Sequence, residues 1–187
     1  MRSGLEQARD KQFGVFTSWQ VLCEYTRVEM RTLIDQGEWV RVFRGVFREA
    51  TTPPTAQLRV EAARLSIGIP SLAAGYGTAA ELHGFALPTT HTTHVFGPQE
   101  SRTGRLVVHR DRVDPTDLEL IQGTVTTNAV RTAVDVARTS PRPDALATLN
   151  TALCHGISRT ALIAEVNRHR RRRGFQQAAE LIELADS

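Results

Sequence analysis

The segment TRVEMRTLIDQGEWVRVFRGVFR, residues 26–48, decides the fold of the N-terminal part of the chain. Thr26 and Glu29 have the spacing of a capping box, in which the threonine oxygen accepts the Glu29 amide and the glutamate returns a bond to the Thr26 amide. Gly37 supplies the left-handed residue that commonly ends a helix. The segment therefore predicts a helix that begins after Thr26 and ends before Gly37.

The helix predicted after Thr26 has two different faces. Apolar residues recur at helical spacing and are expected to be buried, and they are Met30, Leu33 and Ile34. Arg27 and Arg31 lie four residues apart and therefore share another face. This basic face is placed to meet a partner, although an arginine pair with this spacing is also typical of a helix surface that faces only solvent.

The residues that follow, Trp39 to Arg48, predict a β-hairpin. They are rich in aromatic and β-branched residues, and Gly45 permits a tight turn in the middle. Trp39 and Phe43 have the same parity as Arg41, so strand alternation does not assign the two faces. The basic residues on or near this hairpin are Arg41, Arg44 and Arg48.

Two shorter helices are predicted before the segment. The first covers residues 5–12, and the second is capped by Thr17 or Ser18 and runs to about Glu24, with Val21 and Leu22 buried. Three helices followed by a basic hairpin is the layout of a winged helix-turn-helix, whose third helix enters the DNA major groove. The predicted DNA-binding residues are Ser18, Gln20, Arg27, Arg31, Arg41, Arg44 and Arg48. The alternatives are a helical domain that only supports the rest of the chain, and a protein-docking module.

The segment TTPPT, residues 51–55, predicts a linker, because adjacent prolines lack backbone donors and disfavour a helix before them. It divides the chain into a winged helix-turn-helix DNA-binding domain (1–52) and a small α+β domain with a helical C-terminal half (53–187). The second part is expected to contain helices at 59–66 and 77–82, strands at 93–96, 105–109 and 120–126, and helices at 128–138, 144–155, 158–170 and 175–185. The predicted fold class is α+β.

The composition excludes several classes of protein. The 187 residues carry a formal charge of +3 and are 41% hydrophobic, which is typical of a globular protein rather than a disordered or membrane one. No apolar run reaches the roughly 20 residues that a membrane span needs, and the N-terminal residues are too charged for a secretory signal. Cys23 and Cys154 do not suggest a disulfide framework and are expected to be buried. The predicted location is the cytoplasm, without a membrane partner.

Arginine dominates the basic residues, since Lys11 is the single lysine among 23. Arginine suits phosphate groups and guanine edges, but a GC-rich genome produces the same bias. The densest run, RHRRRR at residues 168–173, lies where a helix is expected to end, and consecutive side chains on a helix point in all directions. We interpret it as a solvated helix end and as an auxiliary basic patch for a phosphate or an acidic partner, formed by Arg170, Arg171, Arg172 and Arg173.

Two patterns resemble cofactor or metal sites. The stretch GYGTAA, residues 75–80, matches a dinucleotide fingerprint by its letters, but no convincing strand precedes it, so a turn into a helix is favoured. Four histidines lie close in sequence, but they lack cysteine or carboxylate partners at metal-ligand spacing. These histidines are His83, His91, His94 and His109.

No catalytic constellation is recognised in the sequence. Asp111, Asp114 and Asp117 flank a proline and are interpreted as a solvated loop rather than as a nuclease site. Neither a Walker loop nor a nucleophile elbow is present. The sequence therefore predicts a protein that is not an enzyme and that holds neither a metal nor a cofactor.

The order of several short motifs resembles an actinobacterial group of AbiEi-type antitoxins. Residues 13–49 are similar to the N-terminal winged helix of these proteins, in which a hairpin with the pattern G-W-x-R-x-x-R-G-V-Y/F follows the recognition helix. The residues that match the hairpin are Trp39, Arg41, Arg44, Gly45, Val46 and Phe47. The later motifs are TAAELHGFALP (78–88), HVFGP (94–98), LVVHRDRV (106–113), TTNAVRTAVDVAR (126–138), ALATLNTAL (145–153) and AAELIELADS (178–187).

The resemblance implies an antitoxin and transcriptional regulator in two parts. The winged helix would bind inverted repeats in its own promoter, with a homodimer as one arrangement on the DNA, and repress transcription. The remainder would counteract a cognate nucleotidyltransferase toxin. Longer relatives continue after the last motif into an endonuclease-like tail, which we expect this chain to lack. The alternative is a stand-alone regulator without a toxin partner.

Overall fold

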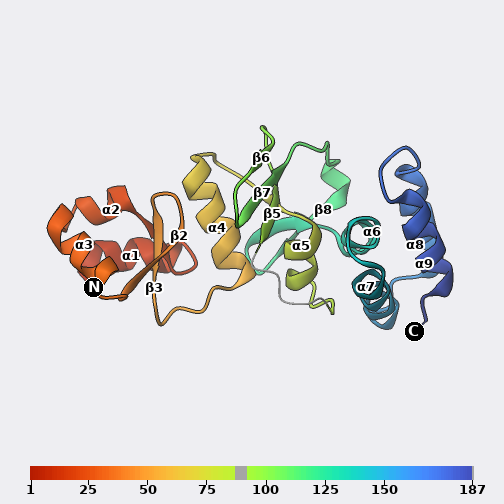
Figure 1. Cartoon of the computed structure of the whole chain (residues 1–187), viewed down its shortest axis with the longest axis horizontal. Coiled ribbons are helices and arrows are strands. Elements are labelled where there is room, and N and C mark those ends of the chain that lie inside the picture. The colour runs from red at the N-terminus through yellow and green to blue at the C-terminus, as the bar shows by residue number, and fades with distance from the viewer. Residues whose placement is uncertain (87–91, 187) are drawn as a thin grey trace. The chain divides into compact units, whose positions relative to one another are not determined.

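The computed structural model describes residues 1–86 and 92–186, and the chain forms two compact units, Met1–Leu72 and Ala73–Ser187 (Figure 1). In the first unit, helices pack against a small antiparallel sheet. In the second, a mixed sheet is followed by a group of helices. The predicted α+β fold class is confirmed.

The N-terminal unit contains the three helices and the hairpin that the sequence predicts. Its elements are α1 (Ser3–Lys11), β1 (Val15–Thr17), α2 (Ser18–Leu22), α3 (Arg27–Asp35), β2 (Trp39–Phe43), β3 (Val46–Glu49) and α4 (Ala56–Ile67). The strands form an antiparallel sheet in the order β1-β3-β2. The short strand β1 was not predicted, because three residues are too few to show an alternating pattern.

A register shift in the hairpin explains the ambiguous alternation of β2. Arg41 lies opposite Phe47, whereas Phe43 lies opposite Val46, so the pairing shifts between the two positions of β2. Trp39 is buried with Phe47 in one apolar cluster, and Phe43 packs against a second cluster that contains Val46. Such a bulge turns the strand locally, which places Phe43 on the opposite face from Trp39 although the two residues have the same parity.

The boundary between the units lies after Leu72 and not at residue 52, where the proline pair predicted it. Helix α4 follows the prolines but packs against all three strands of the N-terminal sheet. Leu58 and Ala62 complete the apolar cluster on β1 and β3, and the Ser66 hydroxyl donates to the Arg44 carbonyl at 2.9 Å. Prolines remove backbone donors, but they do not determine the core against which the next helix packs.

The C-terminal unit begins with a mixed sheet. Its first elements are β4 (Ala73–Ala74), α5 (Tyr76–Leu82), β5 (Thr93–Phe96), β6 (Ser101–Arg102), β7 (Leu106–His109), the 3-10 helix η1 (Pro115–Asp117), β8 (Leu118–Ile121) and β9 (Thr124–Thr127). The strand order is β6-β7-β5-β4-β9-β8. The β4–β9 and β5–β7 pairs are parallel, and the other neighbouring pairs are antiparallel.

The single strand predicted at residues 120–126 is in fact two strands of a hairpin. Strands β8 and β9 pair through Ile121 and Thr124, and the turn between them contains Gln122 at φ 48° and Gly123 at φ 81°. Two successive residues with positive φ match the tight primed turns of hairpins. The prediction missed this turn because glutamine is an unusual residue at its first position.

Four helices complete the C-terminal unit, all at the predicted places within a few residues. They are α6 (Ala129–Thr139), α7 (Arg142–Cys154), α8 (Arg159–Arg168) and α9 (Phe175–Leu184). Val134, Leu149, Leu162 and Ile182 contribute one fully buried side chain from each helix. Helix α5 packs against both β5 and α6, and it therefore connects the sheet to this helical core. Within the described part of the chain, none of the helices has the length and apolarity required to cross a membrane.

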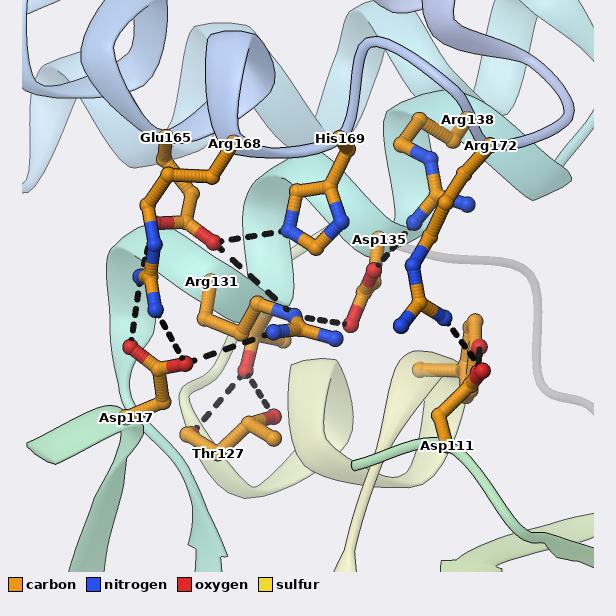
Figure 2. A network of polar contacts seen from close by, with 12 residues as sticks. Asp111, Asp117, Thr127, Arg131, Asp135, Arg138, Glu165, Arg168, His169 and Arg172 are labelled. Atoms are coloured by element: carbon orange, nitrogen blue, oxygen red, sulfur yellow. Dashed lines mark hydrogen bonds and ion pairs between the residues drawn. The ribbon is translucent and has the colours of Figure 1, made fainter. Parts of the chain in front are cut away.

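Helix α6 buries charged as well as apolar side chains. Arg131 and Asp135 are 3% and 0% exposed, and Arg131 Nε donates to Asp135 Oδ2 at 2.7 Å. Arg138 Nη1 donates to the other Asp135 oxygen at 2.7 Å. Asp135 therefore has an arginine donor on each of its carboxylate oxygens, which is what a buried charge requires (Figure 2).

The prediction of a solvated loop around Asp117 is wrong. Asp117 is 3% exposed and accepts from Arg131 Nη1 at 3.3 Å and from the guanidinium of Arg168 at 2.7 and 2.9 Å. Asp111 is half-buried and accepts from the Tyr76 hydroxyl at 2.9 Å. Of the three aspartates only Asp114 is exposed, and it caps η1. The sequence did not show this because the cationic partners lie far away along the chain.

Three residues expected in the core are exposed. They are Leu22, Cys23 and Cys154. Leu22 and Cys154 are the last residues of α2 and α7, and Cys23 is the C-cap of α2. Helix α2 ends at Leu22, two residues earlier than predicted, and of the two residues expected to be buried on it Val21 is in the core.

The turn between α8 and α9 gives a prediction about stability. Gly174 has φ +79°, and a Cβ atom there would lie 1.9 Å from the Arg138 carbonyl oxygen. Gly156 also has positive φ, but a Cβ atom there would meet no described atom within 4 Å. We expect Gly156→Ala to cost about 1–2 kcal/mol from its left-handed backbone alone. Gly174→Ala should cost at least about twice that, because the α6 backbone must also move.

The comparison is made by urea unfolding of the full chain, with hydrogen exchange in α6 and α9 as the readout for the C-terminal unit. Equal losses of stability in the two variants would contradict the close approach of Gly174 to α6.

Candidate nucleic-acid interface

Helix α3 begins with the predicted capping box. Thr26 Oγ1 accepts the Glu29 amide at 3.2 Å, and Glu29 Oε2 accepts the Thr26 amide at 2.7 Å. These hydrogen bonds from Thr26 lower the pKa of Glu29, so the carboxylate is ionised and fixed at the helix start. The first turn of α3 is thereby defined without any tertiary contact.

Arg2 contributes to the same helix end, and no pattern in the sequence pointed to it. Its Nη2 donates to Glu29 Oε1 at 2.6 Å, and its guanidinium lies 4.3 Å from the centre of the Tyr25 ring. An exposed pair of this kind contributes little to stability. It does balance the one carboxylate in the first turn of α3, where the helix dipole already favours an anion.

The solvent face of α3 carries the predicted arginines. Arg27 and Arg31 are exposed, and the apolar stripe of Met30, Leu33 and Ile34 packs against the core as predicted. Arg31 Nε lies 3.6 Å from an oxygen of Asp35, with side chains 85% and 70% exposed. Because solvent screens such a pair strongly, the Arg31 guanidinium can exchange this partner for a phosphate at little cost.

Two apolar side chains on the surface of α2 and α3 were missed by the sequence analysis. Trp19 is 80% exposed and Val28 is 76% exposed. Helical spacing places Val28 beside Arg27 and Arg31 on the outer face, so the exposure of Val28 could have been predicted from the sequence. Val28 follows Arg27 directly and lies three residues before Arg31, so the outer face of α3 carries an apolar side chain together with its two arginines.

The hairpin turn lies against the start of α2. The Ser18 amide donates to the Gly45 carbonyl at 2.9 Å, which brings Ser18 close to the exposed Arg44. Arg41 is exposed on β2, with its guanidinium carbon 5.7 Å from the centre of the Phe47 ring. The structure therefore brings Ser18 and Arg44 together and presents Arg41 on the adjoining strand.

Two of the predicted DNA-binding side chains are used inside the unit. Gln20 Oε1 accepts the Thr17 amide at 2.7 Å in a second capping box and also accepts from Gln12 at 3.2 Å. Arg48 Nη1 donates to three carbonyl oxygens of the loop at residues 49–52, at 2.7 to 3.0 Å. Gln20 and Arg48 therefore hold the unit together and have fewer groups to offer a partner than the exposed arginines have.

The C-terminal run at residues 168–173 is exposed except for the buried His169 and the partly exposed Arg172. Helix α8 ends at Arg168, two residues earlier than expected, and His169 is 4% exposed. Arg172 donates to Asp111, whereas Arg170, Arg171 and Arg173 are exposed. The auxiliary basic patch therefore retains three of its four arginines at the surface.

The glycine-rich stretch at residues 75–80 begins α5. The strand β4 does precede it, contrary to expectation, but it pairs antiparallel with the next strand β5. A dinucleotide site requires a parallel βαβ unit, which this antiparallel pairing excludes. Gly75 is needed because a Cβ atom there would lie 2.3 Å from the Phe96 ring.

His94 and His109 form a stacked pair. Their Nδ1 and Nε2 atoms are 3.0 Å apart, and the His109 ring centre lies 4.2 Å from that of Tyr76. Burial lowers the pKa of His94 to about 4 and also lowers that of His109. Both rings are therefore neutral at pH 7.

The other two histidines of the predicted group lie elsewhere. His83 Nε2 lies 2.8 Å from the Thr127 carbonyl oxygen, and His91 is outside the described residues. Among residues 1–86 and 92–186, no three side chains of histidine, cysteine, aspartate or glutamate are grouped closely enough to hold a metal ion.

Comparisons with known proteins give a family and a fold. A sequence model of the AbiEi antitoxin C-terminal domain matches residues 73–184. The uncharacterized proteins MT2308 and Rv2248, from the CDC 1551 / Oshkosh and ATCC 25618 / H37Rv strains of Mycobacterium tuberculosis, are each 36% identical over 164 residues. The match covers 86% of this chain and 59% of each relative.

The crystal structure of the RV2827C protein from Mycobacterium tuberculosis is similar to this chain, with a TM-score of 0.62. The alignment covers 95% of this chain and 74% of that structure, at 15% sequence identity. At this identity the similarity shows a common fold and nothing more about function.

The histidine pair predicts a loss of stability in mild acid. Folding lowers both pKa values, so the unfolded chain takes up protons between the ordinary value of 6.5 and about 4 that the folded unit does not. The free energy of unfolding should therefore fall as the pH falls through this range. His94→Gln should weaken that dependence, as measured by urea unfolding at a series of pH values. The carboxylates contribute equally to the pH dependence of the wild type and of the variant, so a difference between them reports on the histidine pair. An unchanged pH dependence in the variant would contradict this role of the pair.

Proposed function

The chain belongs to the AbiEi antitoxin family, and on that premise we propose that it is the antitoxin of a toxin–antitoxin pair and binds its own promoter DNA through the N-terminal unit. The chain spans 59% of the length of the curated relatives that it matches. The DNA partner, the autorepression and the nature of the toxin are therefore all parts of the proposal.

The observation that carries the DNA-binding proposal is the geometry of α3 and the hairpin. The element order α1-β1-α2-α3-β2-β3 is that of a winged helix, with α3 as the recognition helix and the β2–β3 turn as the wing. The N-terminus of α3 is capped, its only first-turn carboxylate is paired, and Arg27 stands beside it. The N-terminus of α3 and the Arg27 guanidinium therefore present a positive electrostatic potential to solvent, at a helix end whose first turn is fixed by hydrogen bonds.

We assign the residues of this surface to two kinds of contact. Arg27, Arg31, Val28 and Thr32 face solvent from α3, so they are placed to reach base edges, with Val28 suited to a thymine methyl group. Arg41, Arg44 and Ser18 surround the wing and the start of α2, so they are placed to hold phosphates. Contacts of α3 with base edges would give a preference for particular DNA sequences, and contacts of the wing with phosphates would give affinity for DNA of any sequence.

The antitoxin activity is proposed for the C-terminal unit. What supports this is that residues 73–184, which match the antitoxin domain, coincide closely with the compact unit that begins at Ala73. The toxin that we propose is a nucleotidyltransferase encoded next to this gene. A chain that bound DNA but did not neutralise such a toxin would be a stand-alone winged-helix regulator.

The DNA-binding proposal is tested by fluorescence anisotropy with a labelled duplex from the region upstream of the gene. The double variant R41A/R44A should weaken binding and reduce the slope of log K against log salt by about 0.9 for every phosphate that the variant no longer neutralises. Lys11→Ala is the control, because Lys11 is exposed at the end of α1, outside the proposed interface.

A sequence preference is expected as well, because the wild type should bind a scrambled duplex more weakly than the upstream one. If R41A/R44A and Lys11→Ala bind alike, the wing is not part of the interface. If no duplex binds, the N-terminal unit is a docking module for a protein.

The antitoxin proposal is tested by co-expression with the neighbouring nucleotidyltransferase. We expect the full chain to restore growth, and R41A/R44A to restore it equally when both are expressed from a foreign promoter, because the proposed neutralising unit is intact. Persistent toxicity with the wild-type chain would overturn the antitoxin assignment without affecting the DNA-binding one.

A further inference from the structure

The C-terminal unit contains an open pocket with a volume of about 260 Å³. Its walls come from α6, from η1 and the segment between β7 and η1, and from the end of α8 with the turn that follows. The lining residues are Arg112, Asp114, Asp117, Arg131, Arg168, His169 and Arg172. Four arginines against two aspartates make this lining unlike an ordinary surface hollow.

The two aspartates of the lining are bound by protein donors to different extents. Asp117 accepts on both oxygens from Arg131 and Arg168. Asp114 Oδ1 accepts the amide and the hydroxyl of Thr116 at 3.0 and 2.7 Å. Both oxygens of Asp117 and one oxygen of Asp114 are therefore occupied, while the arginines have more donors than these bonds use.

Two buried nitrogens of the lining provide the second observation. Arg131 Nη2 and His169 Nδ1 have no hydrogen-bond partner among residues 1–86 and 92–186, although the two residues are only 3% and 4% exposed. A guanidinium N–H is a donor in every protonation state, so Arg131 Nη2 requires an acceptor. A buried donor without an acceptor destabilises the folded state. Because Arg131 belongs to the pocket wall, a bound ligand could supply that acceptor.

The orientation of His169 follows from its other nitrogen. Burial alone would raise the pKa of Glu165, but hydrogen bonds from His169 and Arg168 outweigh it and the pKa lies below its ordinary value. Glu165 is thus an ionised acceptor, and His169 Nε2 donates to its Oε1 at 2.9 Å. The imidazole is held by this bond, as Figure 2 shows, with His169 between Arg168 and Arg172 and above Arg131.

Carboxylates that pair with the lining arginines determine the net charge around the pocket. Asp135, Glu165 and Asp111 pair with the same arginines, so the whole group is close to neutral in charge. Attraction of an anion must then come from N–H groups aimed at it rather than from net charge. Directed donors of this type favour an oxyanion with several oxygens over a simple halide.

We propose that this pocket binds the phosphate group of a phosphate monoester. A tetrahedral phosphate presents oxygens to several walls at once, whereas a carboxylate offers only two in one plane. Arg131 Nη2 donates to it from the buried side, and Arg112, Arg168 and Arg172 donate from the open side. The volume exceeds that of the ion alone, so the organic group of the ester lies toward the exposed Arg112.

The proposal is tested by isothermal titration calorimetry of the full chain with inorganic phosphate, adenosine 5′-monophosphate and adenosine. We expect the monophosphate to bind more tightly than inorganic phosphate, and adenosine not to bind. Arg112→Ala should weaken binding of the monophosphate by about tenfold, as for removal of one charged hydrogen bond. Arg112 is exposed, so this variant is expected to fold. Arg171→Ala is the matched control, because Arg171 is exposed and belongs to the neighbouring run but does not line the pocket.

A second readout locates the ligand. In NMR spectra, the ring signals of the buried His169 should shift when the monophosphate is added, and those of the exposed His155 should not. Three outcomes would overturn the proposal. These are equal weakening by Arg171→Ala, tighter binding of inorganic phosphate than of the monophosphate, and absence of binding at millimolar concentrations, which would mean that the buried Arg131 donor does not recruit an anion.

Discussion

The fold of the C-terminal unit depends on the guanidinium of Arg131, which binds Asp135 on its own helix and Asp117 at the end of η1. Moving such charges out of water costs several kcal/mol per ion, and only complete pairing offsets that cost. Because Asp117 also binds Arg168, and Arg168 binds Glu165, the pairing continues into α8. Removal of one partner would leave a buried charge and cost about 3–5 kcal/mol. The mutual positions of α6, η1 and α8 are therefore fixed by polar contacts as well as by the apolar core.

This network is also where prediction from the sequence failed. The helix at 128–138 was predicted at the right place, because its apolar spacing is local information. That its charged residues are buried was not predicted, because Arg131 binds Asp117, which lies 14 residues away along the chain, and Asp117 in turn binds Arg168, which is 51 residues from it. For the same reason Asp117 was interpreted as solvated and Arg172 as part of a surface patch. Periodicity identifies a face of a helix, but only tertiary structure shows whether a charged face meets solvent or a matching charge.

The N-terminal unit was predicted more completely, because its determinants are local. The capping box of Thr26 and Glu29 sets the start of α3, and the turn at Gly45 sets the hairpin, within a few residues of sequence. What the sequence could not supply were contacts across the unit, such as Arg2 on Glu29 and α4 on the sheet. The proposed interface also changes, because Gln20 and Arg48 form hydrogen bonds within the unit while Val28 and Trp19 are exposed.

The two units use arginine in opposite ways, and this difference is a stronger guide to function than the number of arginines. In the N-terminal unit, Arg27, Arg31, Arg41 and Arg44 stand exposed on regular elements, where they can exchange weak or solvent contacts for a phosphate backbone. In the C-terminal unit, Arg131 and Arg138 bind buried carboxylates, and even the dense run at 168–173 directs two arginines to aspartates of the same unit. A charge run therefore does not identify an interface. An arginine is a candidate for one when the fold leaves some of its donors unused or weakly paired, as on the outer face of α3 and at the Arg131 donor of the pocket lining.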